Sequence, residues 1–228
     1  MTMASRYDRQ VLLFGEEGQK KLAEAKVGIA GCGGLGTVVV TNLASAGIGS
    51  MIIADKDVPD ITNLNRQFVY REGDTESKAD LLSQWACDLN PEVAVDYYEG
   101  ELNGFTLPVL FEDCDILVDC LDNMETRKLL NAFSQETGKV LVHAGVTGYT
   151  GQVTVIVPGK TPDLEGIYRY VKAPEGIPPS LGSMVSLIGS LEATQVVQMV
   201  TGTGSPLVGK LAAVDLQNGS MEIIDLSS

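Results

Sequence analysis

The feature that most constrains the fold of this chain is a glycine-rich turn between two uncharged segments. Gly31-Cys-Gly-Gly-Leu-Gly36 follows the apolar run 26–30, which predicts a short strand, and precedes residues 37–46, which predict a buried helix. Residues 50–54 predict a second strand. Glycines at this spacing allow a tight turn and bring backbone N–H groups at the start of the helix close to a phosphate. The segment therefore predicts a βαβ unit with a nucleotide site at its turn.

Strands and helices continue to alternate as far as His143. The expected helices cover residues 15–25, 77–90 and 124–137, and the expected strands cover residues 93–98, 115–119 and 140–143. This alternation predicts an α/β fold with a Rossmann-like, mainly parallel sheet and helices on both faces.

Antiparallel strands are expected in the C-terminal third. Residues 151–157 and 210–225 are extended runs, and Asn218-Gly219 within the second predicts a type I′ hairpin turn. Residues 183–200 predict another buried helix, while residues 158–179, rich in proline, glycine and charge, predict a mobile crossover loop. Since the sequence contains no linker or repeat, we expect a single domain over residues 1–228.

Charge and composition exclude several classes of partner and location. Sixteen Lys and Arg against 30 Asp and Glu give a net charge of −14, which disfavours nucleic acid but not a nucleotide held by a few fixed cations. The uncharged segment 27–54 is interrupted by glycines and polar side chains, so it predicts no membrane span. The four cysteines form no Cys-x-x-Cys pair, which favours a reduced, cytoplasmic setting.

A carboxylate and a group of polar and cationic residues follow the glycine turn. Asp55 ends the second strand, where it can accept hydrogen bonds from ribose hydroxyls. Asn63, Arg66 and Gln67 lie in the next loop, and Lys78 opens the following helix. Two cations here suit the β- and γ-phosphates of a triphosphate and the charge that develops during attack at the α-phosphorus. Taken singly, each cation could equally be a solvated surface residue.

A second acidic segment, Asp119-Cys-Leu-Asp122-Asn123, falls at the carboxyl end of a later strand. Asp122 is a candidate Mg²⁺ ligand, because Mg²⁺ prefers one or two carboxylates together with phosphate oxygens and water. Either aspartate could instead cap the helix that begins near Met124. His143, the only histidine, is interpreted as structural, since attack by a carboxylate needs no general base.

Together with three further segments, these motifs resemble those of a known family. The further segments are Arg6-Tyr-Asp-Arg9-Gln10, Asp55-x-Asp57 and Gly189-Ser-Leu-Glu-Ala193. Over residues 6–215 the chain resembles the ThiF/MoeB/HesA family, relatives of the ubiquitin-activating enzymes. The resemblance implies an adenylyltransferase that uses Mg-ATP to activate a carboxylate and releases pyrophosphate. The usual substrate is the C-terminal glycine of a ThiS- or MoaD-like sulfur carrier with a ubiquitin fold.

The resemblance also implies roles for individual residues. Gly31, Gly33 and Gly34 would approach the nucleotide, and Asp55 would hold the ribose. The phosphates would contact Asn63, Arg66, Gln67 and Lys78, and Mg²⁺ would bind Asp122 with Asn123 beside it. Arg9 would act in trans, reaching across a homodimer interface into the partner's site. The implied catalytic set is Arg9, Arg66, Lys78 and Asp122.

The sequence departs from the family in its cysteines. Many members hold zinc with two Cys-x-x-Cys pairs, but this chain has Ile167-Tyr-Arg-Tyr170 at the first position and no second pair, so no structural zinc is expected. The crossover loop lacks the cysteine with which many members form a persulfide or thioester. The four cysteines, Cys32, Cys87, Cys114 and Cys120, are expected to be buried apolar residues. The reaction is therefore expected to stop at the acyl-adenylate.

Three alternatives remain open. The missing loop cysteine and zinc pairs favour adenylation of a small-molecule carboxylate in cofactor biosynthesis, as in HcgE-like relatives. A non-catalytic or NAD-binding Rossmann module explains the glycine turn and Asp55, but leaves Arg66 and Lys78 without a role. A pseudo-enzyme subunit is disfavoured by the full set of nucleotide-contacting residues.

Overall fold

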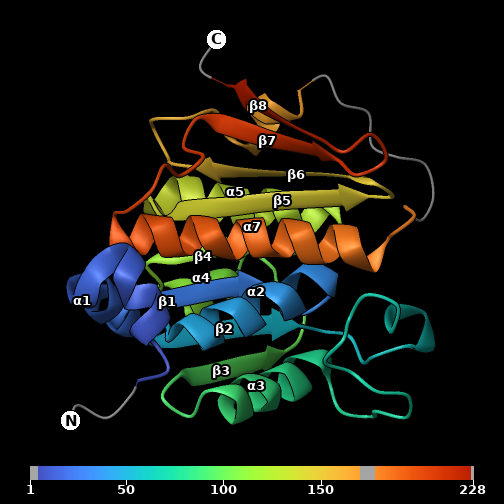
Figure 1. Cartoon of the computed structure of the whole chain (residues 1–228). Coiled ribbons are helices and arrows are strands. Elements are labelled where there is room, and N and C mark those ends of the chain that lie inside the picture. The colour runs from blue at the N-terminus through green and yellow to red at the C-terminus, as the bar shows by residue number, and fades with distance from the viewer. Residues whose placement is uncertain (1–4, 170–177, 227–228) are drawn as a thin grey trace.

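The computed structural model describes residues 5–169 and 178–226, and within them eight strands form one sheet. The strand order is β3-β2-β1-β4-β5-β6-β7-β8 (Figure 1). The parallel strands are β1 (Lys26–Ala30), β2 (Ser50–Asp55), β3 (Ala94–Glu99), β4 (Ile116–Asp119) and β5 (Val140–Thr147). The antiparallel strands are β6 (Thr150–Ile156), β7 (Lys210–Asp215) and β8 (Ser220–Asp225). The expected mainly parallel sheet with antiparallel C-terminal strands is confirmed.

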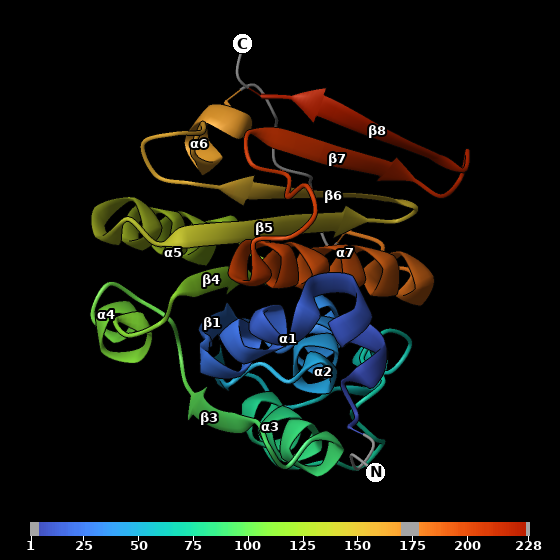
Figure 2. The same ribbon diagram turned by 60° about the vertical axis from the view of Figure 1, so that its left-hand side comes forward.

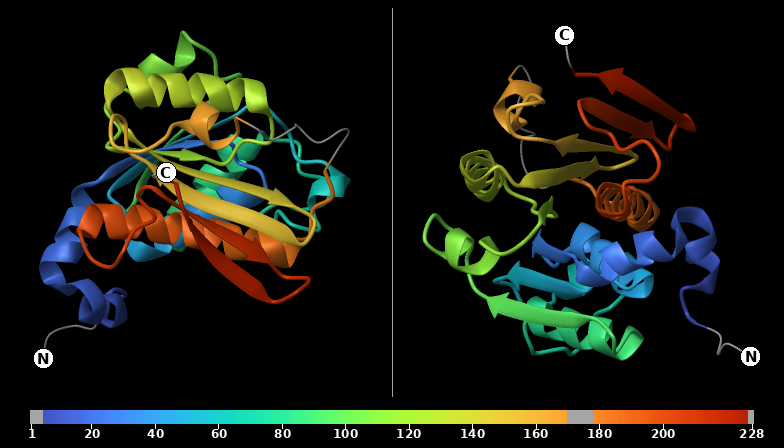
Figure 3. Two further views of the ribbon diagram at one scale, coloured as in Figure 1. Left: turned by 90° about the horizontal axis from the view of Figure 1, so that it is seen from above. Right: turned by 90° about the vertical axis from the view of Figure 1, so that its left-hand side faces the viewer.

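Helices cover both faces of the sheet (Figure 3). One face carries α1 (Asp8–Glu24), α2 (Gly34–Ala46), α3 (Lys78–Leu89) and α7 (Gly182–Thr201), and the other carries α4 (Thr106–Phe111), α5 (Met124–Thr137) and α6 (Leu164–Ile167). Each face has its own apolar core, with Leu22 and Val196 in one and Phe111 and Leu130 in the other. Strand β4 is buried along its whole length, which is why its sequence is a continuous apolar run rather than an alternating one.

The order of the strands in the sheet switches sides between β1 and β4, although the two strands are parallel. Strands β2 and β3 extend from β1 towards one edge, whereas β4 and β5 extend towards the other, where the β7–β8 hairpin lies (Figure 2). In open α/β sheets, ligands bind at the carboxyl ends of the strands next to such a switch point. The glycine turn follows β1 and the segment with Asp122 follows β4, so the fold brings both to this crevice.

The β7–β8 hairpin lies where the sequence predicts it, but the predicted turn type is wrong. A type I′ turn needs positive φ at both central residues, and of the Asn218-Gly219 pair only Gly219 has one, at +67°. Instead, the Asp215 carboxylate accepts hydrogen bonds from the backbone N–H groups of Gln217 and Asn218, at 2.8 and 3.2 Å. These bonds stabilise a longer loop over residues 216–219.

Three helices differ from the sequence-based expectation. Helix α1 begins at Asp8, well before the expected residue 15, and is kinked at Gly15, where φ is +71°. Helix α4 is not predicted by the apolar periodicity. Within the expected crossover loop, α6 is capped by Asp163, which accepts a hydrogen bond from the Gly166 N–H at 2.9 Å. Residues 170–177 of that loop lie outside the described residues, so its mobility stays a prediction.

The burial of the cysteines is as expected for Cys32, Cys114 and Cys120, whereas the prediction for Cys87 is wrong because its side chain is exposed. Helix α3 turns Leu82 and Ala86 towards the core, and the residue after Ala86 is rotated by about 100° away from that direction. Within the described ranges, none of the helices combines the length and apolarity that a bilayer crossing requires.

Candidate functional site

A cleft of about 1410 Å³ runs along the carboxyl ends of the parallel strands. It is lined by all ten residues expected near the nucleotide: Gly31, Gly33, Gly34, Asp55, Asn63, Arg66, Gln67, Lys78, Asp122 and Asn123. Arg9 is not among the lining residues. It lies on α1, which Figure 1 places on the side of the molecule away from these strand ends. The fold thus brings every predicted site residue together except Arg9.

The glycine turn at the floor of the cleft depends on two positions where no side chain fits. Gly31 has φ +98°, and a Cβ there would lie 2.6 Å from the Cys120 carbonyl oxygen. A Cβ on Gly36 would lie 2.0 Å from the Gly31 carbonyl oxygen. Gly33 differs, since the nearest atom to a Cβ there is Gln67 Nε2 at 3.7 Å. Gly31 and Gly36 therefore shape the turn, while Gly33 leaves space open in the cleft.

Asp55 holds this turn from the end of β2. Its Oδ2 accepts a hydrogen bond from the Cys32 N–H at 2.7 Å, and its Oδ1 accepts one from the Asp57 N–H at 2.9 Å. Burial raises the pKa of Asp55 above its ordinary value, although these hydrogen bonds and the charge of Lys78 oppose the shift. Each carboxylate oxygen keeps a further lone pair, so Asp55 can still accept a ribose hydroxyl.

Lys78 enters the cleft as the first residue of α3. Its side chain is only 7% exposed, and its Nζ lies 3.4 Å from Asp57 Oδ2. Ser77 fixes the start of the helix by accepting a hydrogen bond from the Asp80 N–H. The buried Tyr70 links this helix to the glycine turn, with its hydroxyl 2.6 Å from the Cys32 carbonyl oxygen and 3.1 Å from that of Lys78. Lys78 is therefore a desolvated cation at a fixed distance from the turn.

The loop after β2 presents its polar residues to the same space. Arg66 Nη1 donates to the Thr62 carbonyl at 2.8 Å, and a Cβ on Gly34 would lie 3.6 Å from Arg66 Cγ. Asn63 Oδ1 accepts from the Asp60 N–H at 3.1 Å and closes a short 3-10 turn, η1 (Ile61–Asn63). Gln67 is buried, and its Oε1 has no hydrogen-bond partner within the described residues. An unpaired buried oxygen is costly, so it favours a donor arriving with a ligand.

The segment after β4 separates the two aspartates. Asp122 is exposed and lines the cleft, whereas Asp119 is fully buried and cannot reach it. Neither caps α5: the cap is Asn123, whose Oδ1 accepts from the Thr126 N–H at 2.9 Å. In the described part of the chain, no three His, Cys, Asp or Glu residues are grouped closely enough to hold a metal ion. Asp122 suits Mg²⁺ as a single carboxylate, with nucleotide phosphates and water completing the coordination.

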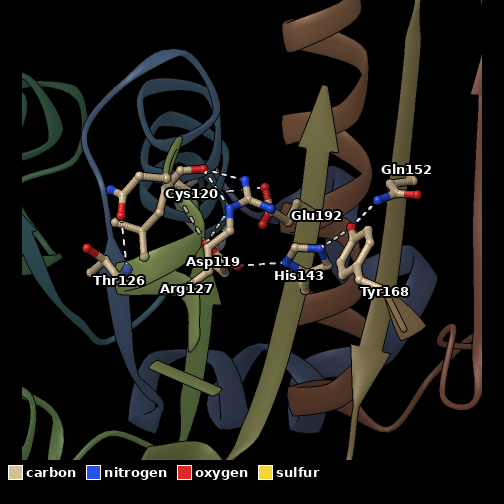
Figure 4. Close-up of polar contacts among 10 residues, drawn as sticks. Asp119, Cys120, Thr126, Arg127, His143, Gln152, Tyr168 and Glu192 are labelled. Atoms are coloured by element: carbon tan, nitrogen blue, oxygen red, sulfur yellow. Dashed lines mark hydrogen bonds and ion pairs between the residues drawn. The ribbon is translucent and has the colours of Figure 1, made fainter. Parts of the chain in front are cut away.

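A buried polar network beside the cleft was not anticipated as a unit (Figure 4). Arg127, on α5, donates through Nε and Nη2 to the Leu121 carbonyl, and its Nε lies 3.7 Å from Asp119 Oδ1. Asp119 Oδ2 lies 2.7 Å from His143 Nδ1, and His143 Nε2 lies 2.7 Å from the Tyr168 hydroxyl. The Tyr168 hydroxyl also accepts from Gln152 Nε2. His143 is fully buried, which agrees with its interpretation as a structural residue.

Burial sets the charges in this network. Burial alone would raise the pKa of Asp119, but the Arg127 charge and the His143 hydrogen bond outweigh it and hold that pKa below its ordinary value. Burial lowers the pKa of His143, despite the opposing effect of Asp119. Burial and the nearby Asp119 charge raise the pKa of Glu192, which lies on α7 with Oε2 3.8 Å from Cys120 Sγ. At neutral pH the network therefore combines the Asp119 anion and the Arg127 cation with a neutral His143, and burial favours the protonated form of Glu192.

The fold and the cleft define an α/β nucleotide-binding protein with a phosphate turn at the switch point of its sheet. Comparison with known proteins identifies its family. The model of the ThiF family matches residues 7–228, and the chain belongs to that family.

Several proteins named as adenylyltransferases or activating enzymes are similar to this chain. The sulfur carrier protein ThiS adenylyltransferase of Escherichia coli is 33% identical, over 92% of this chain and 86% of that protein. The SAMP-activating enzyme E1 of Haloferax volcanii is 30% identical, over 98% of this chain and 85% of the relative. Among solved structures, E. coli MccB with ATP has a TM-score of 0.87 at 24% identity, covering 99% of this chain and 72% of MccB. MccB shares the fold, and the expected family is confirmed.

Proposed function

We propose that this ThiF-family adenylyltransferase activates the C-terminal glycine of a small ubiquitin-like sulfur carrier. Mg-ATP binds in the cleft, the carrier carboxylate attacks the α-phosphorus, and the products are an acyl-adenylate and pyrophosphate. The observation that carries the proposal is the convergence of the glycine turn, Arg66, Lys78 and Asp122 in one cleft. Relatives named as sulfur carrier adenylyltransferases, 33% and 34% identical, support this substrate class.

The chain's own residues supply positioning and charge rather than proton transfer. Backbone N–H groups of the glycine turn and Asp55 orient the nucleotide, while Arg66 and Lys78 balance the charge on the leaving pyrophosphate. Asn63 and Gln67 add polar contacts near the phosphates, and Asp122 with Asn123 faces the metal. Bound Mg²⁺ would neutralise phosphate charge. The attacking carboxylate is already an anion, so no general base is needed.

The size of the cleft favours a carrier over a small-molecule carboxylate. At about 1410 Å³ it exceeds the roughly 300–1,000 Å³ of ordinary ligand pockets. It continues past the nucleotide residues to Gly151 on β6, Val214 on β7 and Glu222 on β8. This extension gives room for a peptide tail beside ATP. We infer that residues 1–228 act as a single adenylation domain, and the continuous sheet supports this.

We also propose a homodimer in which Arg9 completes the partner subunit's site. Arg9 is exposed on α1 and lies outside its own cleft. Next to it, the side chains of Leu12 and Leu13 are 80% and 81% exposed. Burying two exposed leucines against a second subunit would lower the free energy of the protein, which supports an interface at this face of α1.

A cytoplasmic setting fits four free thiols. Exposed Cys87 does not line the cleft, so the proposed reaction ends at the acyl-adenylate.

Two measurements test the nucleotide half of the proposal. Thermal shift should show stabilisation by Mg-ATP and none by NAD, and the reverse would favour an NAD-binding module. With a carrier that ends in Gly-Gly, labelled pyrophosphate should enter ATP. Asp122→Ala should abolish this exchange, whereas Asp113→Ala, a substitution of an exposed acidic residue outside the cleft, should leave it unchanged. Exchange driven only by small carboxylates would favour the alternative substrate class.

A further inference from the structure

Three side chains of the buried network, Arg127, Gln152 and Tyr168, reach the wall of the cleft. Tyr168 lies just beyond α6 and lines the cleft together with Gln152 of β6. Its ring meets the His143 ring edge-on, with centroids 5.5 Å apart and planes at 85°. Figure 4 shows His143 between Asp119 on one side and Tyr168 on the other. The tyrosine is thus fixed by residues of two strands, His143 of β5 and Gln152 of β6, and its hydroxyl has a defined hydrogen-bonding pattern.

The direction of each hydrogen bond follows from Asp119. An ionised carboxylate can only accept, so His143 Nδ1, at 2.7 Å from it, must carry the proton. A neutral histidine carries one ring proton, so Nε2 is a bare acceptor. The Tyr168 hydroxyl, 2.7 Å from Nε2, must therefore donate its only proton to His143. The reversed tautomer would set a nitrogen lone pair against the carboxylate.

What the cleft meets at Tyr168 is consequently an acceptor. A hydroxyl has one proton and two lone pairs. The proton is used by His143 and one lone pair by the amide N–H of Gln152, which leaves one lone pair. That lone pair repels a carboxylate oxygen and attracts an N–H group. The Tyr168 hydroxyl therefore offers the reacting carboxylate no donor, but it can accept a hydrogen bond from the chain that leads to that carboxylate.

We propose that Tyr168 determines substrate specificity by accepting a hydrogen bond from a peptide N–H in the last two peptide bonds of the acyl substrate, and that His143 and Asp119 position it as an acceptor. The proposal rests on the proposed function and narrows its substrate class. Peptidyl carboxylates carry the required donor, whereas simple carboxylic acids do not. The Arg127 guanidinium, whose Nε lies 3.7 Å from Asp119 Oδ1, favours the anionic form of Asp119 and thereby maintains this polarity.

The tautomer can be tested without any substrate. His143 is the only histidine, so protein labelled with ¹⁵N-histidine gives the ring nitrogens of a single residue. At pH 7 the long-range ¹H–¹⁵N spectrum should show a proton on Nδ1 and none on Nε2. A proton on Nε2, or on both nitrogens, would overturn the inference, because Tyr168 would then be free to donate into the cleft.

Specificity is tested with three forms of the carrier. One ends in ordinary Gly-Gly, and in the others an ester oxygen replaces the N–H of the last or the penultimate peptide bond. In wild-type protein, one of the two esters should raise the KM for the carrier in pyrophosphate exchange about five- to tenfold, the value of a lost hydrogen bond, with little change in kcat. Tyr168→Phe should raise the KM for the amide carrier by a similar factor, and its KM values for the amide and ester carriers should be equal. The matched control Tyr149→Phe, at an exposed tyrosine outside the cleft, should discriminate as wild type does.

The outcomes separate the two proposals. Suppose that the amide carrier supports exchange, but Tyr168→Phe discriminates between amide and ester carriers as strongly as wild-type protein does. That result would overturn the inference and leave the proposed function intact. If no carrier supports exchange in wild-type protein, the proposed function fails, and the peptide specificity fails with it. Stabilisation of Tyr168→Phe by Mg-ATP in thermal shift would show that the variant is folded.

Discussion

Lys78 is the residue in which burial and function are most closely linked. A lysine with a side chain 7% exposed loses most of its hydration, and the carboxylate of Asp57 lies 3.4 Å from its Nζ. Such a cation is already desolvated when a triphosphate arrives, so its interaction with phosphate oxygens is stronger than that of a surface lysine. Arg66 differs, because its guanidinium is held by backbone and side-chain oxygens of its own loop.

Replacement of Lys78 tests this role. We expect Lys78→Ala to lower kcat for pyrophosphate exchange by about 10²- to 10³-fold, the usual effect of removing one transition-state donor. The matched control is Lys20→Ala, at an exposed lysine of α1 that pairs with Glu24, which should retain wild-type activity. Exchange kinetics over a range of ATP concentrations measure both. Wild-type kcat in Lys78→Ala would contradict the assignment.

Glu192 makes stability depend on pH. Its pKa is raised in the folded protein by burial, and its Oε1 has no partner within the described residues. Below about pH 4.5 the carboxyl is protonated in both folded and unfolded chains, so it contributes no cost. Above that pH only the unfolded chain loses the proton, and the free energy of unfolding falls as pH rises towards the folded pKa.

Glu192→Gln removes this titration. At pH 7.5 the variant should melt a few degrees higher than wild type, since about 1 kcal/mol corresponds to about 2–4 °C for a chain of this size. The gain should shrink towards zero near pH 4. Melting curves of both proteins across this range give the comparison. An equal or larger gain at pH 4 would show that the effect does not come from ionisation.

At the level of the elements, the β1–α2 turn separates folding from binding. Gly36→Ala sets a Cβ 2.0 Å from a carbonyl oxygen, so we expect it to cost about 3 kcal/mol of stability. Gly33→Ala meets nothing closer than 3.7 Å and should fold normally, but its methyl occupies space facing the nucleotide. Denaturant unfolding should show that Gly36→Ala is destabilised and that Gly33→Ala is as stable as wild type. Titration with Mg-ATP should show weaker ATP binding by Gly33→Ala. Equal stabilities would contradict this division.

Elements could be predicted from the sequence where their causes are local. The βαβ unit follows from apolar runs and a glycine turn within residues 26–54, and those are close to the observed bounds. The Asn218-Gly219 turn was mispredicted because a neighbouring side chain, Asp215, accepts the loop N–H groups and favours a different geometry. Cys87 was mispredicted because the apolar face of α3 is narrower than its sequence indicates, leaving even Trp85 38% exposed.

Considering the whole molecule, the convergence of the residues proposed to contact the nucleotide was predictable, and the network behind them was not. Asp55, Lys78 and Asp122 each follow a strand or begin a helix at one edge of a parallel sheet, so topology alone brings them together. Asp119, His143 and Tyr168 meet only through the order of β4 and β5 and the return of the chain after β6. Their spacings of 24 and 25 residues carry no periodic signal.

The proposed dimer predicts a pattern of complementation between variants. Arg9→Ala and Lys78→Ala proteins should each be nearly inactive, but mixed dimers contain one site with Lys78 and the partner's Arg9. After subunit exchange, equal mixing should restore about a quarter of wild-type exchange activity. Leu13→Glu, which puts a charge at the exposed α1 face, should shift the protein to monomers in sedimentation. Absence of complementation between dimeric variants would rule out action in trans.

The central claim is that the cleft joins AMP to a carrier's terminal glycine, and intact-mass spectrometry of the carrier tests it most directly. A carrier ending in Gly-Gly, incubated with this protein and Mg-ATP in the absence of any sulfur donor, should gain the mass of one adenylate. The gain should require the terminal glycine and disappear with Arg66→Ala. A carrier whose mass stays unchanged while the protein binds ATP would contradict the account.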